Sequence, residues 1–408
     1  MSAPPGAVTG VGAVTPLGVG ADALYEGWKR GESGLDGGTG TCDDFDPAAT
    51  LSRKQARRTE RFVQLALAAC QEAVDQAWAD GSPYEPERVA CVLGVAFGGT
   101  QTMFDQYEVM KERGVAAISP LTVPVIMPNA PPAVLAMSHG FRGETRSVAS
   151  ACASSAQAIG EGLRMLRSGE YDAVIVGGSE ACLTDFVIGA FRNAGALSRT
   201  GHSLPFDRRR DGFVISEGAA ILILENAGLA EKRGADVLAY VSGYSSSTDG
   251  HHLTAPAVDG KTCARAMRAA LADAGREPSA VDWVNAHGTG TPANDKAETN
   301  AIKVALGDHA YKVPVSAPKS VTGHSIGAAG AVEAVATVKA LRDRTVPPTV
   351  GLDEQDEELD LHYVPNESIP LVHPNGDGSD AGRGDDRMVV TSNSFAFGGH
   401  NAVLVIEG

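Results

Sequence analysis

Short apolar runs alternate along the chain with longer segments in which apolar residues recur at helical spacing. The short runs are bounded by glycine and polar residues, which is typical of buried strands. The alternation therefore predicts an α/β protein. The expected strands lie at residues 88–99, 146–151, 171–181 and 219–227.

The strand pattern begins again near residue 235. Residues 236–250, DVLAYVSGYSSSTDG, are similar to residues 6–20, GAVTGVGAVTPLGVG, because both contain a strand pattern followed by a loop of small residues. A repeat of this kind suggests a duplicated fold with halves at residues 1–234 and 235–408.

Composition limits the partners and the location of the protein. With 408 residues, 43% of them hydrophobic, the chain can bury a large core. The net charge of −16 argues against nucleic acid or an anionic membrane as the main partner, since either requires a dominant basic surface. The sequence lacks a membrane-spanning apolar run and a signal peptide, so we expect a cytoplasmic protein. Residues 374–387, rich in glycine and aspartate, predict a solvated loop.

The cysteines are scattered without a C-x-x-C pair, which fits neither a disulfide framework nor a zinc site. We expect free thiols and no metal. Gly10 and Gly12 begin a G-x-G pattern, but Thr15 stands where a dinucleotide site requires a third glycine. We therefore expect no cofactor.

Cys152 stands among small residues at the point where a strand pattern gives way to a helix pattern. Ala156, Ile159 and Leu163 then recur at helical spacing. The unpaired N–H groups and the dipole at a helix start favour a thiolate. A free cysteine is also a common small core residue, so this segment alone leaves both interpretations open.

His287 follows an apolar run that ends at Ala286 and begins a loop of glycine, threonine and proline. Loops at strand ends commonly display catalytic groups, although a lone histidine there is more often structural. Thr289 and Thr291 can line a polar pocket. Asp295 is expected to hold the loop or to cap the following helix.

The segment from Ser325 to Val338 is apolar on nearly every side of the predicted helix, and Glu333 is its single charged residue. A buried carboxylate needs a partner, and Lys319, at the end of a strand pattern, is the best local candidate. His324 lies at the helix N-terminus, where the dipole disfavours an imidazolium, so we expect a neutral, hydrogen-bonding ring. A capping histidine is the alternative.

The chain closes on two strand patterns around a turn at Phe397, Gly398 and Gly399. Paired glycines permit unusual backbone angles and allow main-chain N–H groups to approach a ligand closely. A plain hairpin is the default interpretation of one such turn.

Together these segments resemble the elongating β-ketoacyl-acyl-carrier-protein synthases, the ketosynthases of fatty acid and type II polyketide assembly, within the thiolase-like superfamily. The resemblance covers nearly the whole chain, through TGVGAVTPLG, WKRGESGL, SACASS, PFDRRRDGFVISEGAA, NAHGTGTPANDKAE, KSVTGHSIGAAGAVE and NSFAFGGHN. It implies two similar α/β halves in a five-layer αβαβα fold, the N-terminal half carrying the nucleophile and the C-terminal half both catalytic histidines.

The resemblance implies that Cys152 is the nucleophile and that His287 and His324 are the paired histidines, and it matches Lys319 with Glu333. The implied reaction is the decarboxylative Claisen condensation of malonyl-carrier protein with an acyl chain held on the cysteine. It would serve fatty acid or type II polyketide biosynthesis, polyenes included. Neutral histidines would stabilise the developing enolate, while the lysine and glutamate would organise the site.

The family pattern also implies an oxyanion hole made by the backbone N–H groups of Cys152 and Phe397. Phe397 would be the gate residue, and residues 246–256 would form a second mobile loop facing it. The family's usual SFGFGG is SFAFGG here, so Ala396 is expected to restrict the backbone angles beside the gate. We expect the substrate pocket to be lined by Thr289, Thr291, Phe191, Thr102 and Tyr107.

Three alternatives differ from this assignment in identifiable residues. Initiating ketosynthases of the acyl-CoA type resemble a Cys-His-Asn arrangement, whereas His324 takes the third position here. CoA-dependent thiolases carry a second catalytic cysteine near the C-terminus, and no cysteine follows Cys263. A non-catalytic chain-length factor, which pairs with a ketosynthase, lacks the nucleophile that Cys152 provides.

The resemblance implies that substrates arrive on phosphopantetheine of a separate acyl carrier protein, because this chain contains no carrier domain. Carrier proteins are acidic, so docking on an acidic chain needs local positive charge. The second choice of docking site is Arg208–Arg210. The first candidates for docking are Arg53, Lys54, Arg57 and Arg58.

The resemblance also implies a dimer. It is either a homodimer or a heterodimer of ketosynthase and chain-length factor.

Overall fold

The computed structural model describes residues 4–374 and 386–408. The solvated loop expected at residues 374–387 lies, apart from its ends, outside the described residues. The expected strands are confirmed, with ends that differ by a few residues. The strands that form the body of the sheet are β1 Gly6–Thr15, β4 Val89–Gly94, β5 Thr145–Val148, β6 Ala173–Glu180, β8 Gly218–Asn226, β9 Ala239–Thr248, β10 Trp283–Asn285, β11 Val315–Ser316, β14 Val389–Ala396 and β15 His400–Glu407.

The order of the strands in the sheet repeats itself. Within the described residues the order is β11-β10-β14-β15-β9-β1-β8-β6-β4-β5, and β2 (Gly18–Val19) pairs with β1 beside this path. In the first half β4 lies parallel to β5 and β6, and β8 is antiparallel to both β6 and β1. In the second half β10 lies parallel to β11 and β14, and β15 is antiparallel to both β14 and β9. The matching topology confirms a duplicated fold, whose halves meet where β1 pairs with β9.

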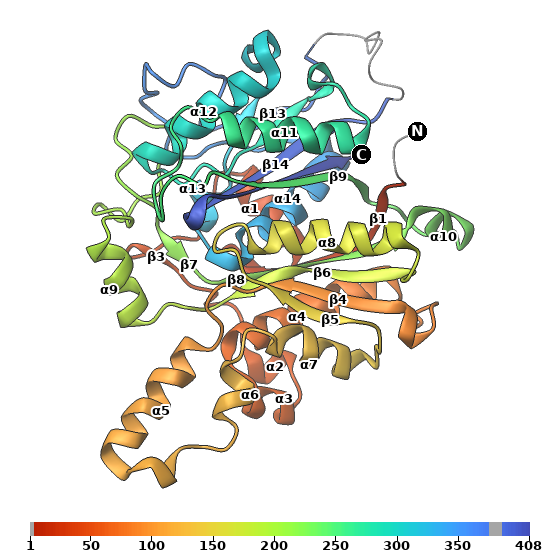
Figure 1. The fold of residues 1–408 in the computed structure, drawn as a ribbon, viewed down its shortest axis with the longest axis vertical. Coiled ribbons are helices and arrows are strands. Elements are labelled where there is room, and N and C mark those ends of the chain that lie inside the picture. Colours follow the sequence, from red (N-terminus) through yellow and green to blue (C-terminus); the bar gives the residue numbers. More distant parts are fainter. Residues whose placement is uncertain (1–3, 375–385) are drawn as a thin grey trace.

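Helices cover the two halves of the sheet in three layers (Figure 1). Helices α4 (Arg61–Ala77) and α7 (Ala130–His139) form one outer layer, and α11 (Lys261–Ala274) and α12 (Pro292–Leu306) form the other. Helices α8 (Ser154–Ser168) and α14 (Ala329–Asp343) lie between the two halves. The five-layer αβαβα arrangement is confirmed.

Smaller elements complete the described fold. None of its helices is both long and apolar enough to cross a membrane. The remaining elements are α1 Ala21–Lys29, α2 Pro47–Thr50, α3 Arg53–Arg58, α5 Thr100–Arg113, α6 Thr122–Ile126, α9 Asp185–Asn193, α10 Ala227–Lys232, α13 Lys319–Thr322, and the short strands β3 Thr39–Gly40, β7 Ile215–Ser216, β12 Thr345–Val346 and β13 Ile369–Pro370.

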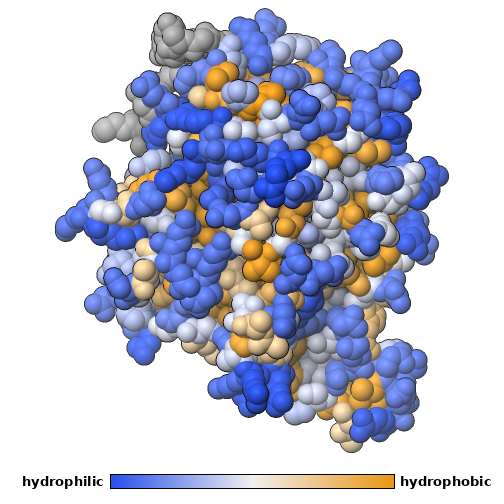
Figure 2. All heavy atoms as spheres, turned by 180° about the vertical axis from the view of Figure 1, so that it is seen from behind, coloured by the Kyte–Doolittle hydropathy of each residue, from blue (hydrophilic) through white to orange (hydrophobic). Residues whose placement is uncertain are grey.

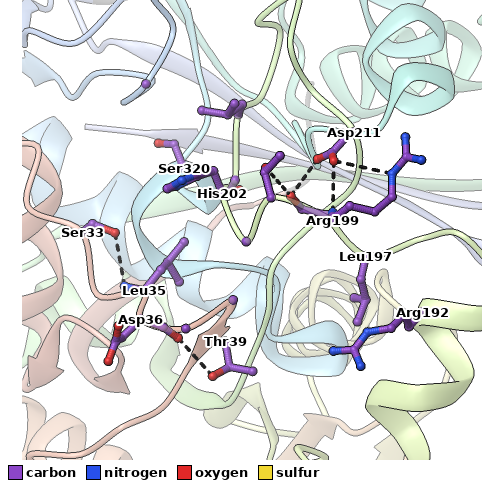
Figure 3. Close-up of a pocket in the computed structure, with 18 of the residues that line it drawn as sticks. Ser33, Leu35, Asp36, Thr39, Arg192, Leu197, Arg199, His202, Asp211 and Ser320 are labelled. Carbon is purple, nitrogen blue, oxygen red and sulfur yellow. Dashed lines mark hydrogen bonds and ion pairs between the residues drawn. The ribbon is translucent and has the colours of Figure 1, made fainter.

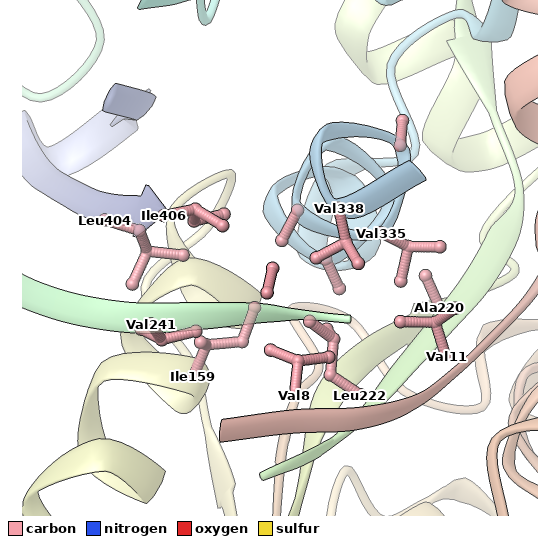
Figure 4. Close-up of a cluster of buried hydrophobic side chains, with 14 of the residues drawn as sticks. Val8, Val11, Ile159, Ala220, Leu222, Val241, Val335, Val338, Leu404 and Ile406 are labelled. Atoms are coloured by element: carbon pink, nitrogen blue, oxygen red, sulfur yellow. The ribbon is translucent and has the colours of Figure 1, made fainter. Parts of the chain in front are cut away.

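The central core forms where α14 packs against strands of both halves. Val335 and Val338 of α14 face Val8, Leu222 and other aliphatic side chains of the strands (Figure 4). All are fully buried, and burial of apolar surface is the main favourable contribution to folding. This explains why the sequence of α14 is apolar on almost every side.

Small residues allow α8 and α14 to pack closely. A Cβ placed on Gly330 would lie 2.9 Å from both the Cβ of Ala156 and the Oγ of Ser394. The backbone N–H of Ala331 donates a hydrogen bond of 2.9 Å to the Oγ of Ser155. The run of alanine and serine after Cys152 therefore has a packing role as well as leaving room at the helix start.

A lobe carrying α5 projects from the body of the molecule (Figure 1). Met103, Tyr107, Val115, Leu121 and Val123, on α5 and the segment that follows it, are exposed. Figure 2 shows apolar side chains among polar ones on this lobe, at the lower right of the view from behind. An apolar group of this kind on a projecting segment is typical of an interaction surface.

We expect Gly330→Ala to lower the free energy of unfolding by about 1 to 3 kcal/mol, because the added methyl group separates α8 from α14. Urea unfolding of the purified chain measures this change. Gly189→Ala on α9 is the matched control, since a Cβ there meets no atom within 4 Å. The control should be neutral or more stable, and equal stability of Gly330→Ala and the parent chain would contradict the packing described above.

Candidate active site

Five side chains from separate elements meet where the two central helices begin. Cys152 lies two residues before α8, His287 lies two residues after β10, and Lys319 is the first residue of α13. His324 precedes η5 (Ile326–Ala328), the turn that leads into α14, and Glu333 lies within α14. The donor atoms of Cys152, His287 and His324 lie within 4.8 Å of one another. The topological repeat therefore brings together residues that are far apart in the sequence.

A strained turn presents Cys152 at the start of α8. Ala151 has φ of 50°, a left-handed conformation that only a small side chain tolerates without strong crowding. The Oγ of Ser154 donates to the carbonyl of Ala151 at 2.6 Å and accepts from the N–H of Ser150 at 2.9 Å. These bonds hold the turn, so the serine after the cysteine fixes the position of the thiol.

Hydrogen bonds join the five side chains in two groups that lie side by side. The Sγ of Cys152 lies 2.9 Å from the Nε2 of His324. The Nζ of Lys319 donates to the Nδ1 of His287 at 3.2 Å and also to the carboxylate of Glu333. The buried pair of Lys319 and Glu333 expected from the sequence is therefore present. Lys319 begins a short helix instead of ending a strand.

Both histidines are neutral at physiological pH. Burial lowers the pKa of His287 and of His324 well below the ordinary range, and the positive charge of Lys319 lowers both further. The neutral state expected for His324 is present, but its main cause is burial. The helix dipole proposed from the sequence is not needed, because η5 separates His324 from α14.

The protonation state of Cys152 differs from the one that the sequence predicts, a stabilised thiolate. Burial raises its pKa to about 11, even though the charge of Lys319 and the backbone N–H groups of Phe397 and Cys152 favour the thiolate. Loss of solvation outweighs these contributions. The resting thiol is therefore protonated, and the adjacent His324 is the nearest group able to accept its proton.

Glu298 supports His287 and was missed by the sequence reasoning. Its carboxylate accepts hydrogen bonds of 2.8 Å from the backbone N–H groups of His287 and Gly288, and one of 3.1 Å from the amide of Asn393. It is fully buried. In the sequence Glu298 is visible only as a second acidic residue one turn after Asp295, which does not identify its partners.

Asp295 and Thr291 shape the loop that carries His287. Asp295 accepts from the backbone N–H groups of Phe206 at 2.8 Å and Gly290 at 3.2 Å, which confirms that it holds the loop. Thr291 caps α12 through the N–H of Asn294 and lies 3.0 Å, hydroxyl to hydroxyl, from Thr289. The loop is thus fixed by its own polar residues.

A cavity of about 680 Å³ opens onto Cys152, His287 and His324. Of the residues expected to line a substrate pocket, Phe191, Thr289 and Thr291 do so.

Thr102 and Tyr107 lie outside this cavity, contrary to expectation. They belong to α5, where the N–H of Thr102 donates to Glu60 and Tyr107 is 53% exposed. The helix α5 projects from the body of the molecule (Figure 1), and none of its residues lines the cavity.

Two segments beside the cavity are bonded to each other. The N–H of Gly398 donates to the carbonyl of Leu253 at 2.7 Å, and the N–H of Asp249 donates to the carbonyl of Gly399 at 2.9 Å. The amide of Asn401 donates to Asp249 at 2.7 Å. The turn at Phe397 and the loop at residues 249–256 therefore form one connected rim.

Ala396, which also lines the cavity, has an extended backbone with φ of −126° and ψ of 159°. An alanine adopts this conformation without strain. The positive φ angles of the turn fall on Gly398 and Gly399. Ala396 therefore introduces no backbone strain in this conformation of the rim.

Comparison with known proteins agrees with this arrangement. The family model described as "Beta-ketoacyl synthase, N-terminal domain" matches residues 5–230, and the model for the C-terminal domain matches residues 238–353. The chain belongs to the β-ketoacyl synthase family. It is a condensing enzyme of the acyltransferase type and has the thiolase-like fold of its structural neighbours.

Curated relatives and solved structures match over nearly the whole chain. The 3-oxoacyl-[acyl-carrier-protein] synthase 2 of Synechocystis is 38% identical, covering 98% of this chain and 97% of the relative. The protein of the same name from Staphylococcus aureus strain COL is 36% identical with the same coverage. The ishigamide ketosynthase/chain length factor has a TM-score of 0.89 at 32% identity, covering 99% of both chains.

A further solved neighbour is described as a type II PKS acyl-carrier protein in complex with its ketosynthase bound to the hexaketide. It has a TM-score of 0.88 at 28% identity and covers the whole of both chains.

A second cavity of about 880 Å³, more polar than the first, lies beside it in this β-ketoacyl synthase, and the two share Gly195. Figure 3 shows Asp36 and Thr39 on one side and Arg199 with Asp211 on another. The backbone N–H of Arg199 donates to Asp211 at 3.0 Å. Its lining has a larger polar share than that of the first cavity, so it suits an aliphatic chain less well.

The two candidate basic sites differ in their partners. Arg208 pairs with Glu354, Arg209 with Asp207, and Arg210 with Asp356. These three arginines are therefore neutralised locally and do not form a free basic surface. The four cations of α3 are exposed and, within residues 4–374 and 386–408, form no ion pair; they are Arg53, Lys54, Arg57 and Arg58.

The raised pKa of Cys152 predicts the pH dependence of its alkylation. With a thiol pKa of about 11, the thiolate fraction and the alkylation rate should rise about tenfold per pH unit from pH 7 to pH 9. Iodoacetamide labelling followed by peptide mass analysis measures the rate at Cys152. The other five cysteines are buried free thiols and serve as internal controls that should label more slowly. A plateau below pH 8 would contradict a protonated resting thiol.

Proposed function

We propose that this β-ketoacyl synthase condenses malonyl-carrier protein with an acyl chain held on Cys152, with loss of CO₂. The observation that supports this most directly is the contact between Cys152 and His324, with His287 and Lys319 beside them. A nucleophile and two neutral hydrogen-bonding rings in one partly apolar cavity suit acyl transfer followed by stabilisation of an enolate.

The first step is acyl transfer. The Sγ of Cys152 attacks the carbonyl of the incoming thioester, and the C–S bond to the carrier's phosphopantetheine breaks. The thiol proton passes through the Nε2 of His324 to the departing carrier sulfur. The backbone N–H groups of Cys152 and Phe397 act as the oxyanion hole, a role supported by their stabilising effect on the thiolate.

The second step is decarboxylation and condensation. The bond between the malonyl carboxylate and its α-carbon breaks, CO₂ leaves, and the electron pair forms an enolate that attacks the acyl carbonyl on Cys152. The C–S bond to Cys152 then breaks, the extended chain leaves on the carrier, and the departing thiolate takes up a proton from solvent, which restores the thiol. His287 and His324 donate to the enolate oxygen, and charge developing in a buried site gains more from such donors than it would in water.

The two histidines differ in how firmly hydrogen bonds fix the tautomer of the ring. Lys319 donates to the Nδ1 of His287, so the Nε2 of that ring carries the proton and is fixed as a donor. The Nδ1 of His324 has no hydrogen-bond partner among the described residues, so nothing holds it in one tautomer. His324 can therefore accept a proton in the first step and donate in the second, while Lys319 with Glu333 organises the site.

The alternatives considered from the sequence are less well supported. A non-catalytic chain-length factor would not need the strained turn that presents Cys152. A CoA-dependent thiolase would need a second cysteine, and Cys152 is the one cysteine among the described residues that line the cavity. We retain the cytoplasmic location and the division into halves at residues 1–234 and 235–408 as parts of this proposal.

An acyl carrier protein is the proposed substrate carrier, and α3 is its proposed docking site. A groove beside α3 is lined by Lys54 and Arg58 and by apolar residues that include Leu121, Val125 and Met137. A basic rim around an apolar groove is complementary to an acidic partner that presents apolar side chains. The solved neighbour with a bound carrier protein supports a partner of this class.

We also propose a dimer, formed either with a second copy or with a chain-length factor. The strand β5 is an edge strand, and its outer side has no partner strand within the described part of the chain. The exposed apolar side chains on the α5 lobe, together with Phe186 at 68% exposure, provide further surface for a partner. Exposed strand edges and apolar groups of this extent are usually covered in the assembled protein.

The acyl substrate belongs either to primary fatty acid elongation or to a type II polyketide pathway, polyenes included. The first is supported by the two curated relatives and the second by two of the solved neighbours. Offering a series of acyl-carrier proteins with malonyl-carrier protein, with and without a candidate partner subunit, separates these cases by product mass.

Variants of the two central residues test the reaction. Cys152→Ala should form no acyl-enzyme, as measured by intact mass. His287→Ala should still be acylated but should lose about a hundredfold or more in malonyl decarboxylation, because one donor to the enolate is removed. Retained acylation in His287→Ala shows that the chain is folded. Normal acylation of Cys152→Ala would reject the proposed function.

A charge reversal on α3 tests carrier docking. Arg58→Glu should raise KM for the acyl-carrier protein by about tenfold and change kcat little, because the charge affects association more than chemistry. Arg265→Glu, an equal change of charge at an exposed position on α11, is the matched control and should leave KM unchanged. Equal effects of the two variants would show that net charge, and not α3, determines docking.

A further inference from the structure

Glu180 is a fully buried carboxylate next to the active-site cavity that the proposed reaction does not use. It is the last residue of β6 and has no exposed surface. Within the part of the chain that the structure describes, it forms no ion pair. A buried carboxylate without a cationic partner is costly, so its hydrogen bonds must be important for the surrounding structure.

Backbone N–H groups from two distant segments surround this carboxylate. Glu180 accepts from the N–H of Ala96 at 2.8 Å and from that of Phe97 at 3.2 Å. The N–H groups of Gly98 and Gly327 also stabilise its charged form. The carboxylate therefore ties the loop after β4 to the turn η5, two segments that are separated by more than half of the chain.

Backbone N–H groups offset part of the cost of burying the carboxylate of Glu180. Burial raises the pKa of Glu180 to about 7, and the N–H groups of Ala96, Phe97, Gly98 and Gly327 act in the opposite direction. A carboxylate offers lone pairs on both oxygens, whereas an amide replaces one oxygen with a donor. An amide at position 180 would therefore place N–H groups against N–H groups.

The contact with η5 is close and involves a strained neighbour. A Cβ on Gly327 would lie 2.6 Å from the Oε2 of Glu180 and 2.6 Å from the backbone nitrogen of Ala96. The preceding residue, Ile326, has φ of 44°, which is unfavourable for a β-branched side chain. Such a conformation persists only where the surrounding structure enforces it. The contacts of Glu180 with the loop after β4 and with Gly327, called the clasp below, lie next to Ile326 and can enforce it.

Both tied segments form walls of the cavity at Cys152. Ala96, Phe97 and Ile326 line it. The ring of Phe97 packs edge to face against that of Phe191, with centroids 6.1 Å apart. Phe191 in turn contacts Phe213 at 5.5 Å.

These residues form the apolar part of the lining. A separate group of lining residues is polar and comes from the loops, and it includes Thr254, Thr289 and Thr291. The apolar part suits a hydrocarbon chain, and the polar part suits an amide-containing arm such as phosphopantetheine.

We propose that Glu180 is a positioning residue that sets the acyl-chain side of the cavity by clasping the walls that carry Phe97 and Ile326. The inference rests on the proposed function, since it assigns this part of the cavity to the acyl chain. Glu180 touches neither Cys152 nor the histidines in the described contacts, so it governs which chains are accepted and does not take part in bond making. Loosening the clasp lets Phe97 and Ile326 retreat, which favours longer chains over shorter ones.

The test compares rates of acylation of Cys152 by carrier proteins bearing short and long saturated chains, followed by intact mass. Glu180→Gln should raise the ratio of the long-chain rate to the short-chain rate by about tenfold. Gly327→Ala should shift the ratio in the same direction, because its methyl group displaces the carboxylate from the other side. If Glu180→Gln does not fold, the chain-length ratio of Gly327→Ala tests the proposal in its place.

Glu225→Gln is the matched control. Glu225 is also a fully buried carboxylate, but it bonds to Arg233 and Trp78 away from the cavity. Its loss should lower the thermal stability without changing the chain-length ratio. If Glu180→Gln and Gly327→Ala keep the parent ratio, as Glu225→Gln does, the inference is overturned. If the parent chain forms no acyl-enzyme with any carrier, the proposed function itself fails.

Discussion

The close approach of α8 and α14 is the constraint on which the site depends. Cys152 precedes one of these helices and His324 precedes the turn into the other, so their separation sets the distance between Sγ and Nε2. Gly330 against Ala156 and the bond from Ala331 to Ser155 keep that separation small. The small residues around Cys152 therefore maintain the geometry of the site through packing, and a bulkier helix seam would separate Cys152 from His324.

Burial also determines which groups of the site carry charge. Removing solvent raises the pKa of the Cys152 thiol and lowers that of both histidines, which favours a neutral thiol beside neutral rings. Lys319 and Glu333 remain as a bonded pair, so a charged group lies beside the histidines without an uncompensated charge in the interior. A site prepared in this way responds strongly to negative charge that develops on a bound thioester.

The sequence predicted the parts of the site that depend on local pattern. Cys152 before a helix, His287 after a strand and an apolar helix with a single carboxylate at Glu333 were each visible in their own segments. The motif order then indicated the family and the duplicated fold. Prediction failed where the answer depends on tertiary structure. Tyr107 does not line the cavity, because α5 projects from the body of the fold.

The same limit explains the groups that sequence reasoning missed or misjudged. Glu298 and Glu180 bind backbone N–H groups that other segments supply, and no spacing in the sequence reports such partners. The thiol pKa of Cys152 was misjudged because a helix start is a local feature, whereas desolvation depends on everything packed around it.

The topological repeat has a consequence for how this chain can be divided. Each half builds its own layer of sheet and contributes one central helix, yet neither contains a complete site: the thiol belongs to the first half, while both imidazoles and the ammonium group belong to the second. A fragment ending near residue 234 would keep a reactive thiol without its proton acceptor. The repeat is thus a duplication of architecture and not of chemistry, and the groups of the site meet only where the two halves come together.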